Sequence, residues 1–230
     1  MVTTRSVLLG LVWLGFVGYA FIFAPPNQPE TFELIQKLST GDWTDINPLI
    51  AALFNLMGIL PVMYGALLFV DGRGQRLPAW FFSTGSFFLG AFALLPYLAL
   101  RCKNEQFIGS KNWWIRWQDS RVLGAFTLVG MVVLLVYGLG QGDWGDYVAR
   151  FWGDRFIHVM ILDFCLLSLL FPTLLGDDLV RRGLGEKKWI FWAIACTPPL
   201  GMAVYLTLRP PTLEMDQLAE TSPTESLLEV

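Results

Sequence analysis

The chain has 230 residues, of which 54% are hydrophobic, 15% aromatic and only 15% charged. Soluble domains carry about 25% charged residues, so this composition indicates a membrane protein. The apolar residues are spread along the whole chain, which excludes a soluble enzyme with a single anchor. The composition also excludes a disordered chain, a disulfide-rich secreted scaffold and a free nucleic-acid binder. The net charge of -3 says little about partners.

The first apolar run covers residues 7–23 and ends at Ala24-Pro25-Pro26. It is longer than the apolar region of a typical signal peptide, and it lacks a small-x-small cleavage site. We therefore expect a first membrane helix here. Removal of this segment as a signal peptide is the alternative.

Six apolar runs are long enough to cross a membrane. Hydrocarbon about 30 Å thick requires roughly 20 apolar residues in a helix. The runs cover residues 7–23, 48–70, 80–100, 122–139, 156–175 and 189–208. They lack the strict alternation of β-barrel strands. The sequence therefore predicts an all-α, polytopic transmembrane helical bundle of six spans over residues 1–208.

Prolines fall inside several of these runs, where each removes a backbone donor and can kink its helix. They are Pro61, Pro96, Pro172 and the pair Pro198-Pro199. We expect proline-kinked helices. The broken turns either act as hinges around a cavity or are ordinary features of membrane helices.

The segment between the first two runs, residues 24–47, is acidic and contains one basic residue, Lys37. Within it Phe32, Ile35 and Leu38 recur at helical spacing, which predicts a short amphipathic helix in the membrane interface. Tryptophans also gather near the ends of the later runs, as an aromatic belt at the water boundary would require. These are Trp80, Trp113, Trp114, Trp117, Trp189 and Trp192.

Basic residues are concentrated in the segments 101–121 and 176–188. With six spans, both segments share a side with residues 24–47, and that side then holds ten of the 16 Lys and Arg residues. Because short cytoplasmic loops are enriched in Lys and Arg, this count predicts that the three segments face the cytoplasm or its equivalent. Both termini would then lie on the opposite side.

The last segment, residues 209–230, contains five acidic residues together with Ser, Thr and Pro. It has too few apolar groups to fold alone. We expect an acidic, disordered tail that either solvates the end of the chain or binds a basic partner.

Asp163 is the strongest candidate for a binding residue, because it lies deep inside the fifth apolar run. A carboxylate in hydrocarbon must be buried, paired or protonated. Either it fixes helix register through a hydrogen bond, or it serves a proton relay or a ligand. His158 is five positions away, about 140° around a helix, so the two should not pair directly. A partner is expected from another helix, among Asn55, Tyr64, Tyr97 and Thr197.

His158 is the chain's single histidine and stands in the first turn of the same run. It either donates a hydrogen bond to a loop carbonyl or acts as axial ligand of a chlorophyll magnesium or a haem iron. A six-coordinate haem would need a second ligand, and no second histidine exists. Chlorophyll or carotenoid is therefore the cofactor to consider, and His158, Asp163 and Asn55 are the predicted binding residues.

No catalytic or metal-binding motif is present. The three cysteines Cys102, Cys165 and Cys196 lack CxxC spacing. Asp177-Asp178, followed by Arg181-Arg182, is a single acidic pair without the second acidic motif of a magnesium-dependent prenyl transferase. The chain also lacks a Walker loop, GxSxG and HExxH. We expect no metal site, and an enzyme is the less favoured class.

Four stretches resemble a family of uncharacterised multi-pass membrane proteins of cyanobacteria and chloroplasts. They are Phe23-Ala24-Pro25-Pro26-Asn27, Gly41-Asp42-Trp43 with Ile46-Asn47-Pro48, Leu53-Phe54-Asn55-Leu56-Met57-Gly58, and residues 156–164. The resemblance runs from the first apolar run to Arg182. It implies a photosynthetic host and the thylakoid membrane, but no reaction and no catalytic residue.

Two classes of function follow. The first is an accessory, assembly or subunit protein of a larger membrane complex, with photosynthetic subunits and the lipid bilayer as partners and no nucleic acid. The second is a small-solute carrier or membrane enzyme that uses a buried polar site at Asp163 and Asn55. A bare pigment carrier is a third alternative.

Overall fold

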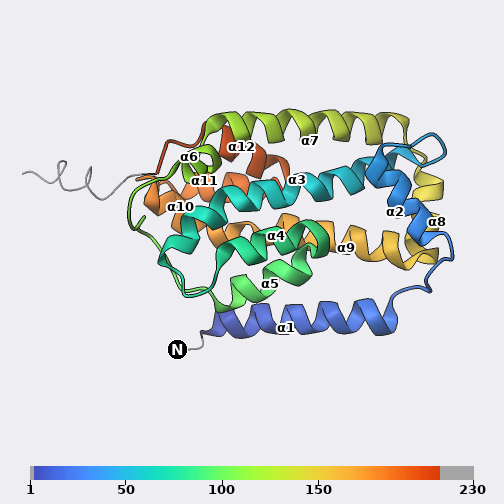
Figure 1. Cartoon of the computed structure of the whole chain (residues 1–230), viewed down its shortest axis with the longest axis horizontal. Helices are drawn as coiled ribbons and strands as arrows, with labels where there is room; N and C mark the ends of the chain where they lie inside the picture. The colour runs from blue at the N-terminus through green and yellow to red at the C-terminus, as the bar shows by residue number, and fades with distance from the viewer. Residues whose placement is uncertain (1–2, 213–230) are drawn as a thin grey trace, which may run out of the picture.

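The computed structural model describes residues 3–212, and all of its regular elements there are helices (Figure 1). This confirms the predicted all-α class. Most of the predicted acidic tail, residues 213–230, lies outside the described residues.

Four helical segments are long and apolar enough to cross a membrane. They are α1 (Thr4–Gly18) with its π-helical continuation η1 (Tyr19–Phe23), α3 (Pro48–Asp71), α7 (Arg121–Gln141), and α9 (Arg155–Leu170) with α10 (Pro172–Arg181). Four of the six predicted runs are thus confirmed as long apolar helices. Each begins where a side chain caps the first free backbone N–H groups, as Asn47 does for α3 and Asp154 for α9.

The third apolar run does not form a single span. It divides into α4 (Ala79–Leu89) and α5 (Ala91–Leu100), and the chain reverses at Gly90, whose φ is 51°. The Gln75 side chain donates to the carbonyl of Cys102 at 2.7 Å and accepts from the Cys102 N–H at 2.8 Å. The segment before α4 therefore lies beside the segment after α5, so the two helices form a hairpin with both ends together.

The sixth run is divided in the same way. It forms α11 (Lys188–Ala195) and α12 (Leu200–Leu208), separated by a turn that contains Pro198-Pro199. Arg182, before α11, donates to the carbonyl of Pro210, after α12. This is a second helical hairpin, and it starts from the same end of the bundle as the first. The six-span prediction fails at these two runs because hydropathy records apolar length but not chain direction.

Prolines have two structural settings here. Pro172 begins α10 and Pro198-Pro199 lies between α11 and α12, whereas Pro61 and Pro96 lie inside α3 and α5. Prolines thus coincide with helix boundaries at two of the four positions.

The remaining helices lie at the ends of the bundle. They are α2 (Thr31–Thr40), η2 (Gly72–Gly74), α6 (Trp113–Gln118) and α8 (Trp144–Gly153). The short helix predicted over this segment is confirmed by α2. Of the three residues predicted to form its apolar face, Leu38 is buried at 2% exposed, whereas Phe32 is 79% exposed.

The two ends differ strongly in charge. We define the acidic end as residues 24–47 and 141–155, and the basic end as residues 3–6, 71–79, 101–121, 176–188 and 208–212 (right and left in Figure 1). The acidic end has seven acidic residues and three basic ones, Lys37, Arg150 and Arg155. The basic end holds the other 13 of the 16 Lys and Arg residues. The hairpins cause this segregation, since the first returns the chain at Arg101 to the end that holds Arg73, and the second returns it at Arg209 to the end that holds Arg182.

The centre of the bundle is α3, which packs against α4, α7 and α9 and contributes many of the fully buried side chains. Apolar residues also cover the outside. A stripe along α7, spaced to follow one helix face, is at least 59% exposed: Val122, Phe126, Val129, Val133 and Val136. An exposed apolar stripe of this length is suited to contact with lipid chains.

Candidate functional site

Asp163 lies on α9 against the tip of the first hairpin. Its side chain is buried, and its Oδ1 accepts a hydrogen bond from the backbone N–H of Ala91 at 2.7 Å. Ala91 is the first residue of α5, so its N–H has no partner within that helix. Asp163 therefore caps α5 from a different helix and holds the hairpin tip to α9.

Gly90 makes this contact possible. Its positive φ of 51° is disfavoured for any residue with a Cβ. A Cβ built on Gly90 would also overlap the carboxyl group of Asp163. The turn and the carboxyl group thus occupy the same small space, and glycine is required for both reasons.

A pocket of about 620 Å³ opens beside Asp163. Its walls come from η1, the start of α2, α3, α9 and the α4–α5 hairpin around its tip, and they are mainly aromatic or aliphatic. The apolar lining residues are Ala20, Phe21, Phe54, Met57, Phe87, Phe88, Leu89, Phe92, Phe156, Val159 and Met160. Asn27, Thr31, Ser86, Arg155 and Asp163 supply the polar groups. An apolar pocket with few polar groups is the usual form of a small-molecule site.

One oxygen of Asp163 is available to this pocket. Asp163 is 6% exposed and lines the pocket, and within residues 3–212 its Oδ2 accepts no hydrogen bond. A carboxyl oxygen in apolar surroundings is poorly solvated, and a donor group on a ligand would supply the missing hydrogen bond. The arrangement can bind an apolar molecule that carries a hydroxyl, amine or amide group.

His158 lies at the acidic end of α9, and both of its ring nitrogens are occupied. Nδ1 lies 2.8 Å from the carbonyl oxygen of Phe151, and Nε2 lies 2.9 Å from the hydroxyl of Tyr19. A carbonyl only accepts, so Nδ1 donates; in the neutral ring Nε2 then accepts from Tyr19. The geometry favours the alternative of a bond to a backbone carbonyl, although Phe151 lies in α8 and not in a loop. It leaves no ring nitrogen free for a magnesium or iron ion.

Asn55 does not join the Asp163 pocket. Its amide donates to the carbonyl of Ala51 in its own helix at 2.8 Å. The other partners proposed for Asp163 are also engaged elsewhere: Tyr64 donates to Leu167, Tyr97 to Asp71 and Thr197 to Ala193. The prediction of a side-chain partner for Asp163 is wrong, because the hairpin supplies a backbone N–H instead.

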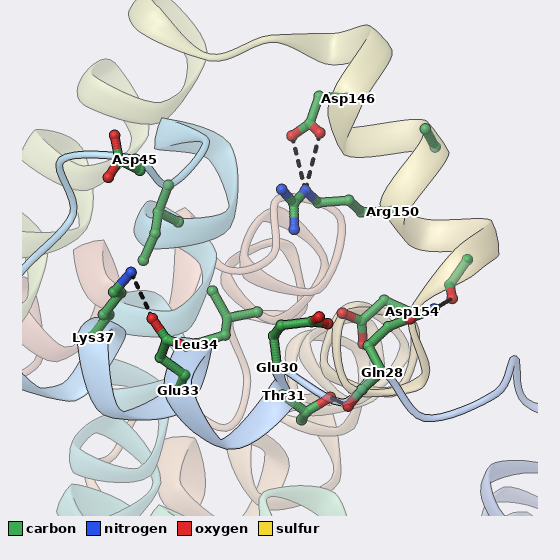
Figure 2. A pocket seen from close by; sticks show the side chains of 13 residues that line it. Gln28, Glu30, Thr31, Glu33, Leu34, Lys37, Asp45, Asp146, Arg150 and Asp154 are labelled. Atoms are coloured by element: carbon green, nitrogen blue, oxygen red, sulfur yellow. Dashed lines mark hydrogen bonds and ion pairs between the residues drawn. The ribbon is translucent and has the colours of Figure 1, made fainter.

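A second pocket, of about 600 Å³, lies at the acidic end between α2 and α8 (Figure 2). It is lined by five acidic residues, Glu30, Glu33, Asp45, Asp146 and Asp154, and two basic ones, Lys37 and Arg150. Lys37 pairs with Glu33 at 2.9 Å, and Arg150 pairs with Asp146 at 3.0 Å. Within residues 3–212, Glu30 and Asp45 form no ion pair. Thr31 lines both pockets, so the two are neighbours.

At the basic end, buried ion pairs join the hairpins to the long helices. Asp71, at the end of α3, accepts from Tyr97 at 2.7 Å and from the Arg101 Nε at 2.9 Å. Arg101 also pairs with Asp177 of α10. These contacts fix the base of the α4–α5 hairpin between α3 and α10.

Asp178 fixes the base of the second hairpin, formed by α11 and α12. Its Oδ2 accepts from the Arg182 Nε at 2.8 Å and from the Tyr205 hydroxyl of α12 at 2.6 Å. Arg182 also donates to Asp119 at 2.7 Å, and Arg209 lies 3.5 Å from Asp178. Burial opposes ionisation of Asp119, but Arg182 and Arg209 outweigh it and hold the pKa of Asp119 below its ordinary value.

Sequence reasoning missed this network, although its members share a recognisable position. Asp71, Arg101, Asp177 and Arg209 all follow closely on the end of an apolar run, and Arg182 lies farther along the segment that begins with Gly176. Both aspartates of the Asp177-Asp178 pair form ion pairs with arginines, Asp177 with Arg101 and Asp178 with Arg182. Across residues 3–212, no group of three or more His, Cys, Asp or Glu residues is arranged to hold a metal ion.

Comparisons with protein-family models, with curated proteins and with solved structures found no match to this chain.

Proposed function

We propose that this chain is a multi-pass integral membrane protein that binds a bilayer-soluble molecule in the Asp163 pocket. Four long helices would cross the bilayer, and the two hairpins would enter it from the basic end without crossing. The exposed apolar stripe on α7 supports this placement. The function is that of a carrier or a binding protein, with Asp163 as the residue that selects the ligand.

The basic end faces the cytoplasm, or the stroma if the membrane is a thylakoid. Thirteen Lys and Arg residues at one end against three at the other support this orientation through the enrichment of cytoplasmic loops in basic residues. It differs from the orientation predicted with six spans, because Arg5, Arg73, Arg76 and Arg209 join the cytoplasmic side and Lys37 leaves it.

One observation carries the ligand proposal: a buried carboxyl group with a free oxygen faces an apolar pocket. The capping of α5 by Asp163 does not require open space beside the carboxyl group. A ligand with a polar head and an apolar body would satisfy the carboxyl group and fill the aromatic walls.

The first test identifies what the purified protein retains. Extraction from its own membranes in mild detergent, followed by mass spectrometry of bound small molecules, should give one enriched species. Asp163→Asn keeps an oxygen for Ala91 but removes the charge, and we expect it to lower retention by about ten-fold. Val159→Trp, which fills the pocket, should abolish retention. Asn55→Ala is the control, because Asn55 lies outside the pocket. Equal retention by all three variants would refute the ligand proposal.

A second candidate function is that of an accessory or assembly subunit of a larger membrane complex. The acidic pocket in Figure 2 favours it, because its carboxylates outnumber its cations and suit a basic segment of a partner. The resemblance to proteins of cyanobacteria and chloroplasts points to photosynthetic subunits, to the thylakoid membrane and to chlorophyll or carotenoid as ligand. An absorption spectrum and a partner list from the same purification test this. A colourless protein without partners would contradict it.

A further inference from the structure

A third pocket, of about 400 Å³, lies at the basic end between the base of the first hairpin and α6. It is bordered by the segment from η2 to the start of α4 and by the start of α6. Its lining includes Arg73, Arg76, Trp80 and Trp114. This pocket shares no residue with the Asp163 pocket.

The charge of this pocket is positive and uncompensated. Arg73 and Arg76 are both exposed, and within residues 3–212 neither forms a hydrogen bond or an ion pair. No lining residue is acidic. By contrast, Arg101 and Arg182 at the same end are each neutralised by two aspartates. The pocket thus presents two guanidinium groups to an anion that the chain itself does not provide.

Its position places the anion at the membrane surface. Trp80 is 62% exposed and Trp114 37% exposed, and both line the pocket. Tryptophan prefers the level of the lipid headgroups. From this level α4 continues into the bilayer with exposed apolar side chains, including Phe81 and Phe88. Acyl chains would find an apolar surface directly beside the two arginines.

We propose that this pocket binds the phosphate headgroup of one anionic phospholipid. Arg73 and Arg76 pair with the phosphate and the anionic headgroup, Trp80 and Trp114 flank it, and the acyl chains lie along α4. Basic pockets between membrane helices at the cytoplasmic surface recognise anionic lipids in this way. The bound lipid would bridge the hairpin base to α6 and so stabilise the hairpin that carries Gly90. This site is independent of the proposed function of the Asp163 pocket.

The test is native mass spectrometry of the detergent-purified, full-length protein, supported by its thermal unfolding midpoint. The probes are phosphatidylglycerol, phosphatidylcholine and inorganic phosphate. The double variant Arg73→Gln/Arg76→Gln removes both cations from the pocket. The double variant Lys187→Gln/Lys188→Gln removes two exposed cations from the same end, outside the pocket. At about 0.15 M salt, charges more than about 8 Å apart are largely screened from each other. The lysine variant therefore tests whether the lipid is attracted to the whole basic end and not to the pocket.

We expect phosphatidylglycerol to bind one per chain and to raise the unfolding midpoint, with no effect of phosphatidylcholine. Arg73→Gln/Arg76→Gln should weaken binding by about ten-fold or more, and Lys187→Gln/Lys188→Gln should not. Arg73→Lys/Arg76→Lys should retain part of the binding, which guards against a folding defect. Equal weakening by both glutamine variants would overturn the site. An equal effect of inorganic phosphate would overturn the assignment to lipid.

Discussion

Replacing Gly90 by alanine is expected to release the first hairpin from α9. Gly90 has a φ of 51°, and such strained backbone costs a residue with a Cβ about 1–3 kcal/mol. The added methyl group would also overlap the carboxyl group of Asp163, so the tip must move away and Ala91 loses its cap. We expect a large drop in the thermal unfolding midpoint and loss of ligand retention.

Two further variants make this prediction specific. Gly58→Ala is the control, because a Cβ at Gly58 has no neighbour within 4 Å and should cost little. Asp163→Ala removes the group that the new methyl meets, so the double variant Gly90→Ala/Asp163→Ala should lose less stability than the sum of the two single variants. An additive double variant, or a Gly90→Ala protein as stable as Gly58→Ala, would contradict the packing described here.

Replacing Asp178 by asparagine is expected to cost about 3–5 kcal/mol of unfolding free energy, the usual loss when a buried ion pair is broken from one side. Asp178 is fully buried and accepts from Arg182 and Tyr205, with Arg209 close by. Without its charge, the arginines at the base of the second hairpin stay buried and only partly compensated. The thermal and chemical unfolding midpoints of the purified protein measure the loss.

The matched control is Asp146→Asn at the acidic end. Asp146 pairs with Arg150 at 3.0 Å, but both side chains are exposed, and such pairs contribute at most about 1 kcal/mol. If Asp178→Asn destabilised the protein no more than Asp146→Asn, the buried network would not hold the hairpin.

Apolar run length predicted the long helices correctly, because about 20 apolar residues between charges are the length that a helix needs to cross the hydrocarbon core. The same criterion failed for residues 80–100 and 189–208, since a hairpin and a single span have equal composition. The proline pair at Pro198-Pro199 was a visible signal for a break. Gly90 was a weaker one, because glycine also occurs inside α3 and α7 without any reversal.

The sequence indicated Asp163 as a candidate binding residue, because burying a carboxyl group in an apolar helix is costly. Its partner was beyond prediction, because the N–H of Ala91 becomes free only when the helix breaks at Gly90. For His158, a bond to a carbonyl was one of the two alternatives, but neither the Phe151 carbonyl in α8 nor the Tyr19 hydroxyl in η1 could be named from the sequence. The arginine network depends on the hairpins and therefore could not be assembled from spans alone.

The sidedness of three cysteines tests the hairpin architecture most directly. Cys102 lies at the basic end. Two further cysteines are introduced, each in a chain whose native cysteines are replaced by alanine. Ser39→Cys marks residues 24–47, and Arg73→Cys marks residues 71–79. Labelling with a membrane-impermeant maleimide in right-side-out and inverted vesicles reports the side of each. We predict that Cys102 and Arg73→Cys react from one side and Ser39→Cys from the other. The contradicting result is that Cys102 and Ser39→Cys react from the same side and Arg73→Cys reacts from the opposite side. The chain would then cross the membrane six times, and residues 80–100 would form a span instead of a hairpin.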